Sequence, residues 1–376
     1  MEHPAGMKSS LSLGKFLGIP IALNLSWFVS FGMVVLLLGW QIYPVLFPQR
    51  SWQLYWLLAM LGAVLFFVSI LLHELAHSLV ALRLGIPVKG ITLFIFGGVS
   101  RLGREPARPM AEFVMALIGP LTSFVLAGLF LSLWGLTEFG NGPLPVLWQW
   151  LAFINLGVGV FNLAPGFPMD GGRLLRSFLW GISGDYRWAT RLAVYTGRGV
   201  AYLLIGAGLL TIVGLDWWPL SAGPWQGLWL LVIGLFLDGA SRQSYLQAQA
   251  LDYLSGRRAT DVLAWDVAQV ERGFPLPVTP SEGLLVVEDG RVVGVVLPIP
   301  NRKGKGRQPT LTAGEAMVNP WRVPLAAPQD DLATLLERMD TAELSWMPVV
   351  EEGHLVGVVR RERIVALLRG QPFWRS

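Results

Sequence analysis

The stretch LLHELAHSLV, Leu71–Val80, places three ionisable side chains inside an apolar segment. The chain is apolar on both sides of it, with LYWLLAMLGAVLFFVSI before and ALRLGIPV after. An ionisable side chain in the middle of a bilayer costs roughly 2.5–3.5 kcal/mol on insertion scales, and such groups are usually paired and functional. His73, Glu74 and His77 therefore need a partner that compensates for their burial.

The spacing of the two histidines suggests a metal ion as that partner. His73 and His77 are four residues apart, so on a helix both imidazoles share one face and can reach a single ion. With Glu74 they form an HExxH pattern, which supplies two zinc ligands and a general base for the metal-bound water. Alternatively, both histidines hydrogen-bond neighbouring helices. The other two histidines, His3 and His354, lie outside the apolar region, so both histidines of that region fall in one motif, which favours a metal.

A catalytic zinc site has three protein ligands and one open position, so a third ligand is expected. Asp170 is our candidate, because it is the sole acid between Phe139 and Ile182 and follows a segment that Pro165 and Pro168 prevent from being helical. Alternatively, Asp170 is a turn or N-cap residue before two glycines.

Two further polar residues lie near these positions in the predicted topology. Asn162 either hydrogen-bonds a neighbouring helix or holds a substrate near the metal. We expect Glu112 to be a solvated acid in the first turn of a helix, where the helix dipole favours it.

The composition separates an intramembrane region from a soluble one. Of the 376 residues, 53% are hydrophobic and 14% are charged, against about a quarter charged in soluble domains. Charges are sparse in residues 1–250 and ordinary in residues 256–376, which predicts an intramembrane domain followed by a soluble one. The chain has no cysteine, which excludes disulfides and thiolate ligands. The net charge of +4 comes without a basic patch of interleaved aromatics, so no nucleic acid partner is expected.

The hydrophobic pattern predicts a polytopic α-helical membrane protein. We predict six spans, at Ile21–Trp40, Leu54–Leu84, Met110–Trp134, Leu147–Leu163, Leu192–Leu215 and Leu228–Ser244. The first is long enough to span a bilayer and is not expected to be a cleaved signal. Lysine and arginine gather in residues 83–109 and 166–191 and are missing from residues 135–146 and 216–225. Because basic loops face the cytoplasm, we place both termini there. The run ITLFIF before Gly97 and Gly98 predicts short strands at the membrane edge.

The soluble end contains a weak internal repeat. LLVVEDGRVVGVVL at residues 284–297 is similar to MPVVEEGHLVGVVR at residues 347–360, and each has two apolar strands around an acidic turn. The polar linker PIPNRKGKGRQPT, residues 298–310, separates them. We therefore expect an α/β domain of two modules, a degenerate one at 256–300 and a second at 311–370.

The intramembrane region resembles the site-2 protease family of intramembrane zinc metalloproteases over roughly residues 15–250. The similarity is carried by HELAH (His73–His77), FGG (Phe96–Gly98), EFVMALIGPLTS (Glu112–Ser123) and FNLAPGFPMDGGRLLRS (Phe161–Ser177). The resemblance implies one zinc ion at His73, His77 and Asp170, Glu74 as the catalytic acid and base, and Asn162 as a substrate-binding residue. It also implies that the strands at 91–101 pair with an unwound substrate.

The tail resembles a pair of CBS modules, which commonly bind adenine nucleotides. The usual site has Thr or Ser and then a ribose-binding Asp after a glycine. After Gly357 those positions are Arg360 and Arg363, and after Gly294 they are Leu297 and Pro300. The basic replacements could attract phosphate, or the CBS pair could form a homodimer.

These observations predict a plasma-membrane zinc protease that cleaves transmembrane segments of membrane-anchored proteins and is regulated by its CBS pair. A second hypothesis is a CBS-regulated ion transporter in which the histidines and Asp170 form an ion path. Glu74 beside His73, with no polar residues continuing across the outer half of the spans, argues against it. A third hypothesis, an inactive membrane scaffold, does not account for the complete ligand set.

Overall fold

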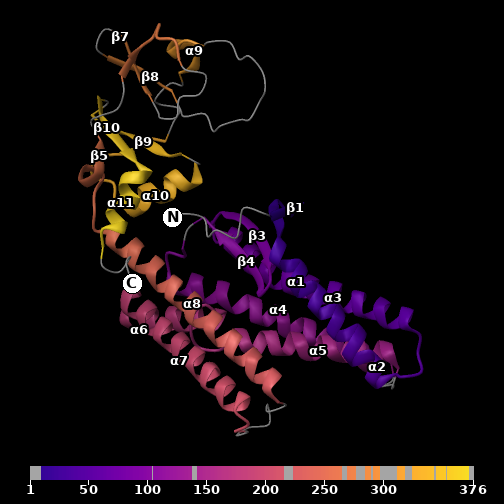
Figure 1. Cartoon of the computed structure of the whole chain (residues 1–376). Helices are drawn as coiled ribbons and strands as arrows, with labels where there is room; N and C mark the ends of the chain where they lie inside the picture. The colour runs from indigo at the N-terminus through magenta and orange to yellow at the C-terminus, as the bar shows by residue number, and fades with distance from the viewer. Residues whose placement is uncertain are drawn as a thin grey trace. The chain divides into compact units, whose positions relative to one another are not determined.

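The chain folds into two compact units, Met1–Tyr245 and Leu246–Ser376, shown in the computed structural model of Figure 1. The structure describes all residues except 1–9, 104, 138–141, 216–222, 265–268, 277–283, 289–290, 297–310, 318–323, 343, 353 and 372–376. The division between the units falls inside one helix, so the expected domain limits, 1–250 and 256–376, stay predictions.

Long helices build the first unit. They are α1 Leu25–Leu36, the π-helical η1 Leu37–Ile42, α2 Tyr43–Leu46, α3 Trp52–Arg83, α4 Pro109–Leu136, α5 Pro143–Asn162, α6 Asp170–Ser183, α7 Tyr186–Ile212 and α8 Pro224–Ser255. Within the described residues, five segments are long and apolar enough to cross a membrane: Leu25–Leu46, α3, α4, α5 and α7. The sixth predicted span lies within α8, which is not among the five, so the count of six stays a prediction.

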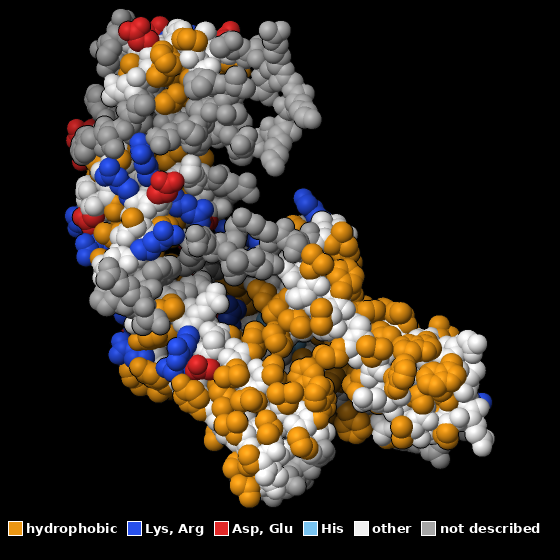
Figure 2. All heavy atoms as spheres, in the orientation of Figure 1, with side chains coloured by type: hydrophobic (Ala, Val, Ile, Leu, Met, Phe, Trp, Pro, Cys, Tyr) orange, Lys and Arg blue, Asp and Glu red, His pale blue; other side chains and the backbone are white. Residues whose placement is uncertain are grey.

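The first unit has an extended apolar surface, which is stable in a lipid bilayer but not in water. Leu203, Val125 and Leu136 are 73%, 64% and 80% exposed, and apolar side chains cover much of the face of the helical unit in Figure 2. Soluble proteins rarely present such extended apolar surface, whereas a helix satisfies its own backbone hydrogen bonds in lipid. The chain is thus a multi-pass membrane protein.

A four-stranded sheet packs against α3. Its strands are β1 Ser10–Phe16, β2 Ile19–Asn24, β3 Val88–Phe94 and β4 Gly97–Leu102, in the order β1-β2-β3-β4. The β2 and β3 strands are parallel, and the other neighbours are antiparallel. Ile91 and Leu93 of β3 are buried in one cluster with Leu75 of α3. The strands predicted around residues 91–101 are confirmed, and they lie over the helix that carries the HELAH motif.

The predicted start of the first span, at Ile21, is wrong. Residues 19–24 form strand β2, in which Ile21 pairs with Ile91, and α1 begins only after Asn24, whose Oδ1 accepts a hydrogen bond from Ser26 N at 3.0 Å. A continuous apolar run has no period that separates a buried strand from a helix. Residues 19–24 form a strand because they pair with β3, which lies far along the chain.

The segment between α5 and α6 is a tightly packed loop. Helix α5 ends at Asn162, within one residue of the predicted end. An added Cβ on Gly166, whose φ is +149°, would lie 2.2 Å from Gly197 Cα of α7, so side chains larger than hydrogen are excluded there. Phe167 N donates to Ala193 O of α7 at 3.2 Å, and Ser241 Oγ of α8 donates to Phe167 O at 2.5 Å. The loop therefore fixes where the next helix, α6, begins.

The second unit contains two three-stranded sheets. The first, β6-β7-β8, consists of Gln269–Glu271, Leu284–Glu288 and Arg291–Val296, and the second, β5-β10-β9, of Leu263–Ala264, His354–Arg360 and Trp346–Glu351. The remaining elements are η2 Ala259–Val262, α9 Ala313–Ala316, α10 Leu332–Thr341 and α11 Arg361–Arg369. The four strands of the predicted repeat are present, whereas the linker 298–310, Leu297 and Pro300 lie outside the described residues.

The two sheets exchange elements along the chain. Strand β5, which precedes the repeat, pairs with β10 of the late sheet. Ala313 of α9, which follows the linker, packs with Val286 and Val296 of the early sheet. The sheets therefore do not coincide with the stretches 256–300 and 311–370, because each module takes one element from the other half.

Candidate metal centre

The two histidines of the HELAH motif are buried one helical turn apart on α3. His73 and His77 are 4% and 7% exposed, and their Nε2 atoms are 3.2 Å apart. Residues at i and i+4 of a helix lie on one face, which brings both rings to one side of α3. The sequence-based placement of the pair is therefore realised in the fold.

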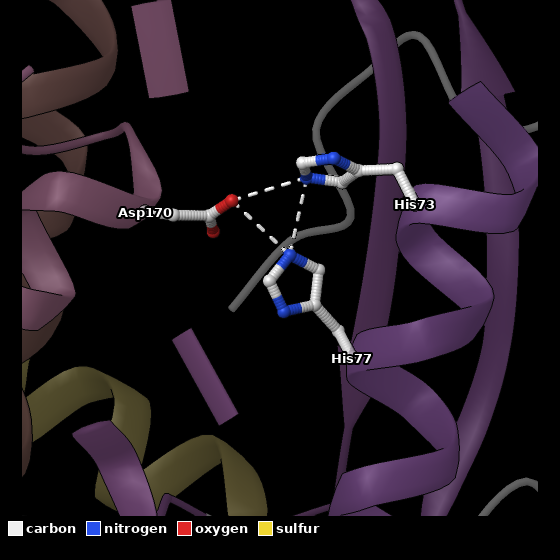
Figure 3. Close-up of side chains that lie close together, drawn as sticks. All are labelled: His73, His77 and Asp170. Carbon is white, nitrogen blue, oxygen red and sulfur yellow. Dashed lines mark hydrogen bonds and ion pairs between the residues drawn. The ribbon is translucent and has the colours of Figure 1, made fainter. Parts of the chain in front are cut away.

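Asp170 reaches the histidines from α6. Its Oδ2 lies 3.1 Å from Nε2 of His73 and 3.1 Å from Nε2 of His77, as Figure 3 shows. The N-cap of α6 is Met169, and Asp170 is the first helical residue, with its side chain directed to the imidazoles. Burial opposes ionisation of this carboxyl, but the two imidazoles lower its pKa below the ordinary value.

Helix α4 holds the other nitrogen of each ring. His73 Nδ1 lies 2.9 Å from Ser123 Oγ, and His77 Nδ1 lies 2.6 Å from the carbonyl oxygen of Met115. A carbonyl can only accept, so Nδ1 of His77 donates to it, and Nε2 is the ring nitrogen that faces Asp170 and can bind a metal ion once it is unprotonated. Such contacts orient the imidazoles of metal sites and raise their basicity.

The three ligand atoms have the separation of a zinc site. They form a triangle with sides of 3.1, 3.1 and 3.2 Å. A tetrahedral zinc ion with bonds of about 2.0–2.1 Å has ligands about 3.3 Å apart. Two imidazoles and one carboxylate are also a donor set that zinc accepts while keeping a fourth position open. The residues present therefore fit a catalytic zinc ion.

Gly119 allows α4 to approach both rings. A Cβ at this position would lie 2.1 Å from His77 Nε2 and 2.6 Å from His73 Nε2. The backbone of α4 therefore forms a wall of the centre that no other residue type could provide without displacing an imidazole. The residues alone did not identify this role, because the packing partner of Gly119 is on another helix.

Glu74 lies beside the triangle, under strand β4. Its Oε2 accepts a hydrogen bond from Ser100 Oγ at 2.9 Å, and Ser100 Oγ is 3.0 Å from Ser78 Oγ of α3. A Cβ on Gly98 would lie 2.5 Å from Glu74 Cγ. Through Ser100 the sheet thus holds the carboxylate beside the candidate metal ligands. Sequence reasoning missed this contact.

Comparisons with known proteins identify the family. The profile of Peptidase family M50 matches residues 61–140 and 138–205, and that of the CBS domain matches residues 314–370. The chain is 33% identical over 384 residues to "Putative zinc metalloprotease sll0528" of Synechocystis, with 96% of each chain covered. This chain belongs to peptidase family M50, the site-2 protease family.

Two further comparisons concern an M50 relative and a solved structure. "Putative zinc metalloprotease Rip3" of Mycobacterium tuberculosis is 34% identical over 383 residues, covering 96% of this chain and 93% of its own. The solved site-2 protease from Methanocaldococcus jannaschii is 29% identical and covers 63% of this chain and 95% of its own, with a TM-score of 0.44. The predicted family and the predicted CBS domain are confirmed.

Two other predicted polar residues of this M50 chain have different outcomes. Asn162 is the last residue of α5 and is partly buried, and its role at the substrate stays a prediction. The expectation that Glu112 is solvated is wrong, since its side chain is fully buried and its Oε1 accepts a hydrogen bond from Arg176 Nε at 2.8 Å. Arg176 lies on α6, so no local pattern indicated the pair.

We predict that Gly119→Ala lowers zinc affinity roughly 10-fold or more, because the methyl group displaces the imidazoles. The control is Gly128→Ala, on the same helix, where an added Cβ meets nothing within 4 Å. Zinc affinity of the purified protein, measured by competition with a chelator, checks both variants. Equal affinities for Gly119→Ala and wild type would contradict the close approach of α4.

Proposed function

We propose that this chain is an intramembrane zinc endopeptidase that cleaves transmembrane segments of membrane-anchored proteins. The observation that carries the proposal is the convergence of His73 and His77 of α3 with Asp170 of α6 on one point. Membership of a metalloprotease family argues against the transporter hypothesis, and experiment must separate an active protease from an inactive scaffold.

The ligand set proposed for zinc is His73, His77 and Asp170, with one ion per chain. When bound, zinc polarises the scissile carbonyl and lowers the pKa of a water molecule toward about 7. Ser123 and Met115 keep the two imidazoles oriented. Helices α3 and α6 thereby present two nitrogens and one carboxylate oxygen to the same point.

Glu74 is the proposed acid and base. Its carboxylate takes a proton from the attacking water and gives it to the leaving amine. Ser100 donates a hydrogen bond to Glu74 Oε2, which leaves Oε1 for the proposed proton transfer.

Strand β4 is the proposed contact for the substrate backbone. It is the edge of its sheet and pairs with β3 alone among the described strands. A transmembrane helix hides its amide groups in internal hydrogen bonds, so the substrate must unwind before cleavage, and an extended segment can then pair with an edge strand. Because β4 also carries Ser100, pairing there would place the segment next to Glu74. Asn162 is proposed to bind the substrate close to the cleaved bond.

We predict that Glu74→Gln lowers the rate of cleavage roughly 10²-fold or more while zinc stays bound, since the amide keeps the side-chain shape and cannot take a proton. The measurement is hydrolysis of a membrane-anchored reporter substrate by purified protein, with zinc quantified in the same samples. Asp170→Ala is the contrasting variant, expected to lower zinc content as well as activity. Substantial cleavage by Glu74→Gln would refute its role, and an inactive wild type with full zinc would favour the scaffold.

We propose a plasma-membrane location with both termini in the cytoplasm, on the basis of the uneven distribution of lysine and arginine between the loops. A reporter fused after Gln249 is expected to be cytoplasmic. A reporter inserted at Gly140, which lies outside the described residues, is expected to be external. Protease protection in sealed vesicles measures both, and a reversed pair of results would overturn this topology.

We propose that the CBS unit regulates cleavage, through substrate access or through homodimer formation. The basic side chains near the expected nucleotide position already have partners, because Arg363 Nη1 donates to Leu263 O at 3.3 Å and Arg361 Nη2 pairs with Asp340 Oδ1 at 2.7 Å. The carboxylate of Asp340 compensates the charge of Arg361, whereas the carbonyl leaves the charge of Arg363 in place at an exposed position.

We therefore predict that the full chain binds AMP or ATP weakly and that added salt weakens the binding further, because the attraction is electrostatic and at the surface. Isothermal calorimetry of the detergent-solubilised protein at low and high salt tests this. Tight binding that does not depend on salt would mean that the unit has a nucleotide site of another design.

A further inference from the structure

A stripe of buried residues on α4 contacts both proposed histidine ligands and the helix that carries Asp170. Glu112, Met115, Gly119 and Ser123 are spaced by three, four and four residues, which places them on one face of a helix. Met115 and Ser123 hold the two histidine rings, and Gly119 lies against both. The remaining member of the stripe, Glu112, has no contact with the histidines and binds α6 instead.

The partner of Glu112 on α6 is Arg176. Nε and Nη2 of Arg176 both donate to Glu112 Oε1, and Nη2 also donates to Glu105 Oε2 at 3.3 Å. Arg176 is 5% exposed and Glu112 is fully buried. Two nitrogens of one guanidinium therefore converge on a single carboxylate oxygen, whereas Glu112 Oε2 is buried without a hydrogen-bond partner among the described residues. A planar guanidinium that donates twice and is itself buried restricts the relative placement of α4 and α6.

Arg176 also contacts the loop that immediately precedes Asp170. Its guanidinium carbon lies 4.9 Å from the centre of the Phe167 ring and 4.8 Å from that of Tyr186. Arg176 therefore holds three things at once: helix α4 through Glu112, the loop through Phe167, and α6 because it is part of that helix. Asp170 lies between the loop and the helix that Arg176 holds.

We propose that Arg176 is a positioning residue that sets Asp170 against His73 and His77, with Glu112 as its anchor on α4. The inference rests on the proposed zinc site. The histidines are fixed to α4 by their distal nitrogens, and Asp170 is fixed to the same helix by the Glu112–Arg176 pair. The separation of the three ligands is thus determined by one shared helix rather than by the loop alone.

The test replaces the ion pair by an apolar pair, Glu112→Leu with Arg176→Met, in the full-length protein. Replacing a buried ion pair by apolar residues of similar size usually preserves folding, so thermal unfolding of the metal-free protein should stay near that of wild type. Zinc affinity, measured by chelator competition, should fall roughly 10- to 100-fold, as for other groups that orient metal ligands. The control is Arg198→Met with Asp238→Leu, which removes a 2.9 Å ion pair between α7 and α8, and it should leave zinc affinity unchanged.

A double-mutant cycle with Asp170→Ala separates positioning from a general structural role. If the pair acts through Asp170, its replacement in the Asp170→Ala background should change zinc affinity by no more than about twofold. A general structural role would cost the same factor in both backgrounds and would overturn the inference. If the apolar pair fails to fold, Arg176→Lys, which keeps the charge and loses the planar fork, is expected to lower zinc affinity, and wild-type affinity in that variant overturns the inference.

The readout also separates this inference from the proposed function. Wild-type protein that binds no zinc overturns both. Wild-type protein that binds zinc, together with an unchanged affinity in the ion-pair variants, overturns only the role of Arg176. Loss of affinity in the ion-pair variant together with an inactive but zinc-loaded wild type supports the role of Arg176 and contradicts the protease.

Discussion

The burial of two imidazoles and one carboxylate at a single point of a lipid-exposed helical unit is the constraint on which the rest of the structure depends. None of these groups would be stable there alone, because an unpaired polar group in a low-dielectric interior loses its hydration without compensation. In this chain His73, His77 and Asp170 compensate one another at 3.1–3.2 Å. The same arrangement also supplies the three protein ligands that a catalytic zinc ion needs. The geometry that compensates for burying these polar groups is therefore also the geometry that suits a metal ion.

Helix α4 supplies what the three ligands cannot supply themselves. It accepts or shares a hydrogen bond at each distal imidazole nitrogen and approaches the rings closely because Gly119 has no side chain. Two turns earlier, Glu112 binds Arg176 of α6. Both histidines and the helix of Asp170 are therefore bonded to the same helix, α4. Contacts to one shared element can keep the distances between ligands constant even though the ligands come from distant parts of the chain.

The sheet links the proposed base, Glu74, to the edge strand β4. Its strands pack on α3, and Ser100 of the edge strand β4 binds the Glu74 carboxylate. An extended segment added to that edge would lie against the strand that holds the proposed base. Binding of an unwound segment and placement of the base would then depend on the same few residues, which suits an enzyme whose substrate must first lose its helical hydrogen bonds.

The sequence by itself identified the residues of the candidate metal centre and most of the membrane-spanning segments. The four-residue spacing within HELAH, the single acid after the proline-broken segment and the apolar runs are local features, and periodicity and composition report them directly. The metalloprotease family and the CBS domain followed from motifs of this kind. The tertiary structure alone decided that residues 19–24 are a strand, because the partner β3 lies far along the chain. It alone decided that Glu112 is buried, because Arg176 on another helix binds one of its carboxylate oxygens. Gly119 and Ser100 likewise gain their places only when α4 and β4 pack on α3. A local pattern specifies which atoms a site contains, whereas the distances between them depend on contacts between segments that the sequence separates.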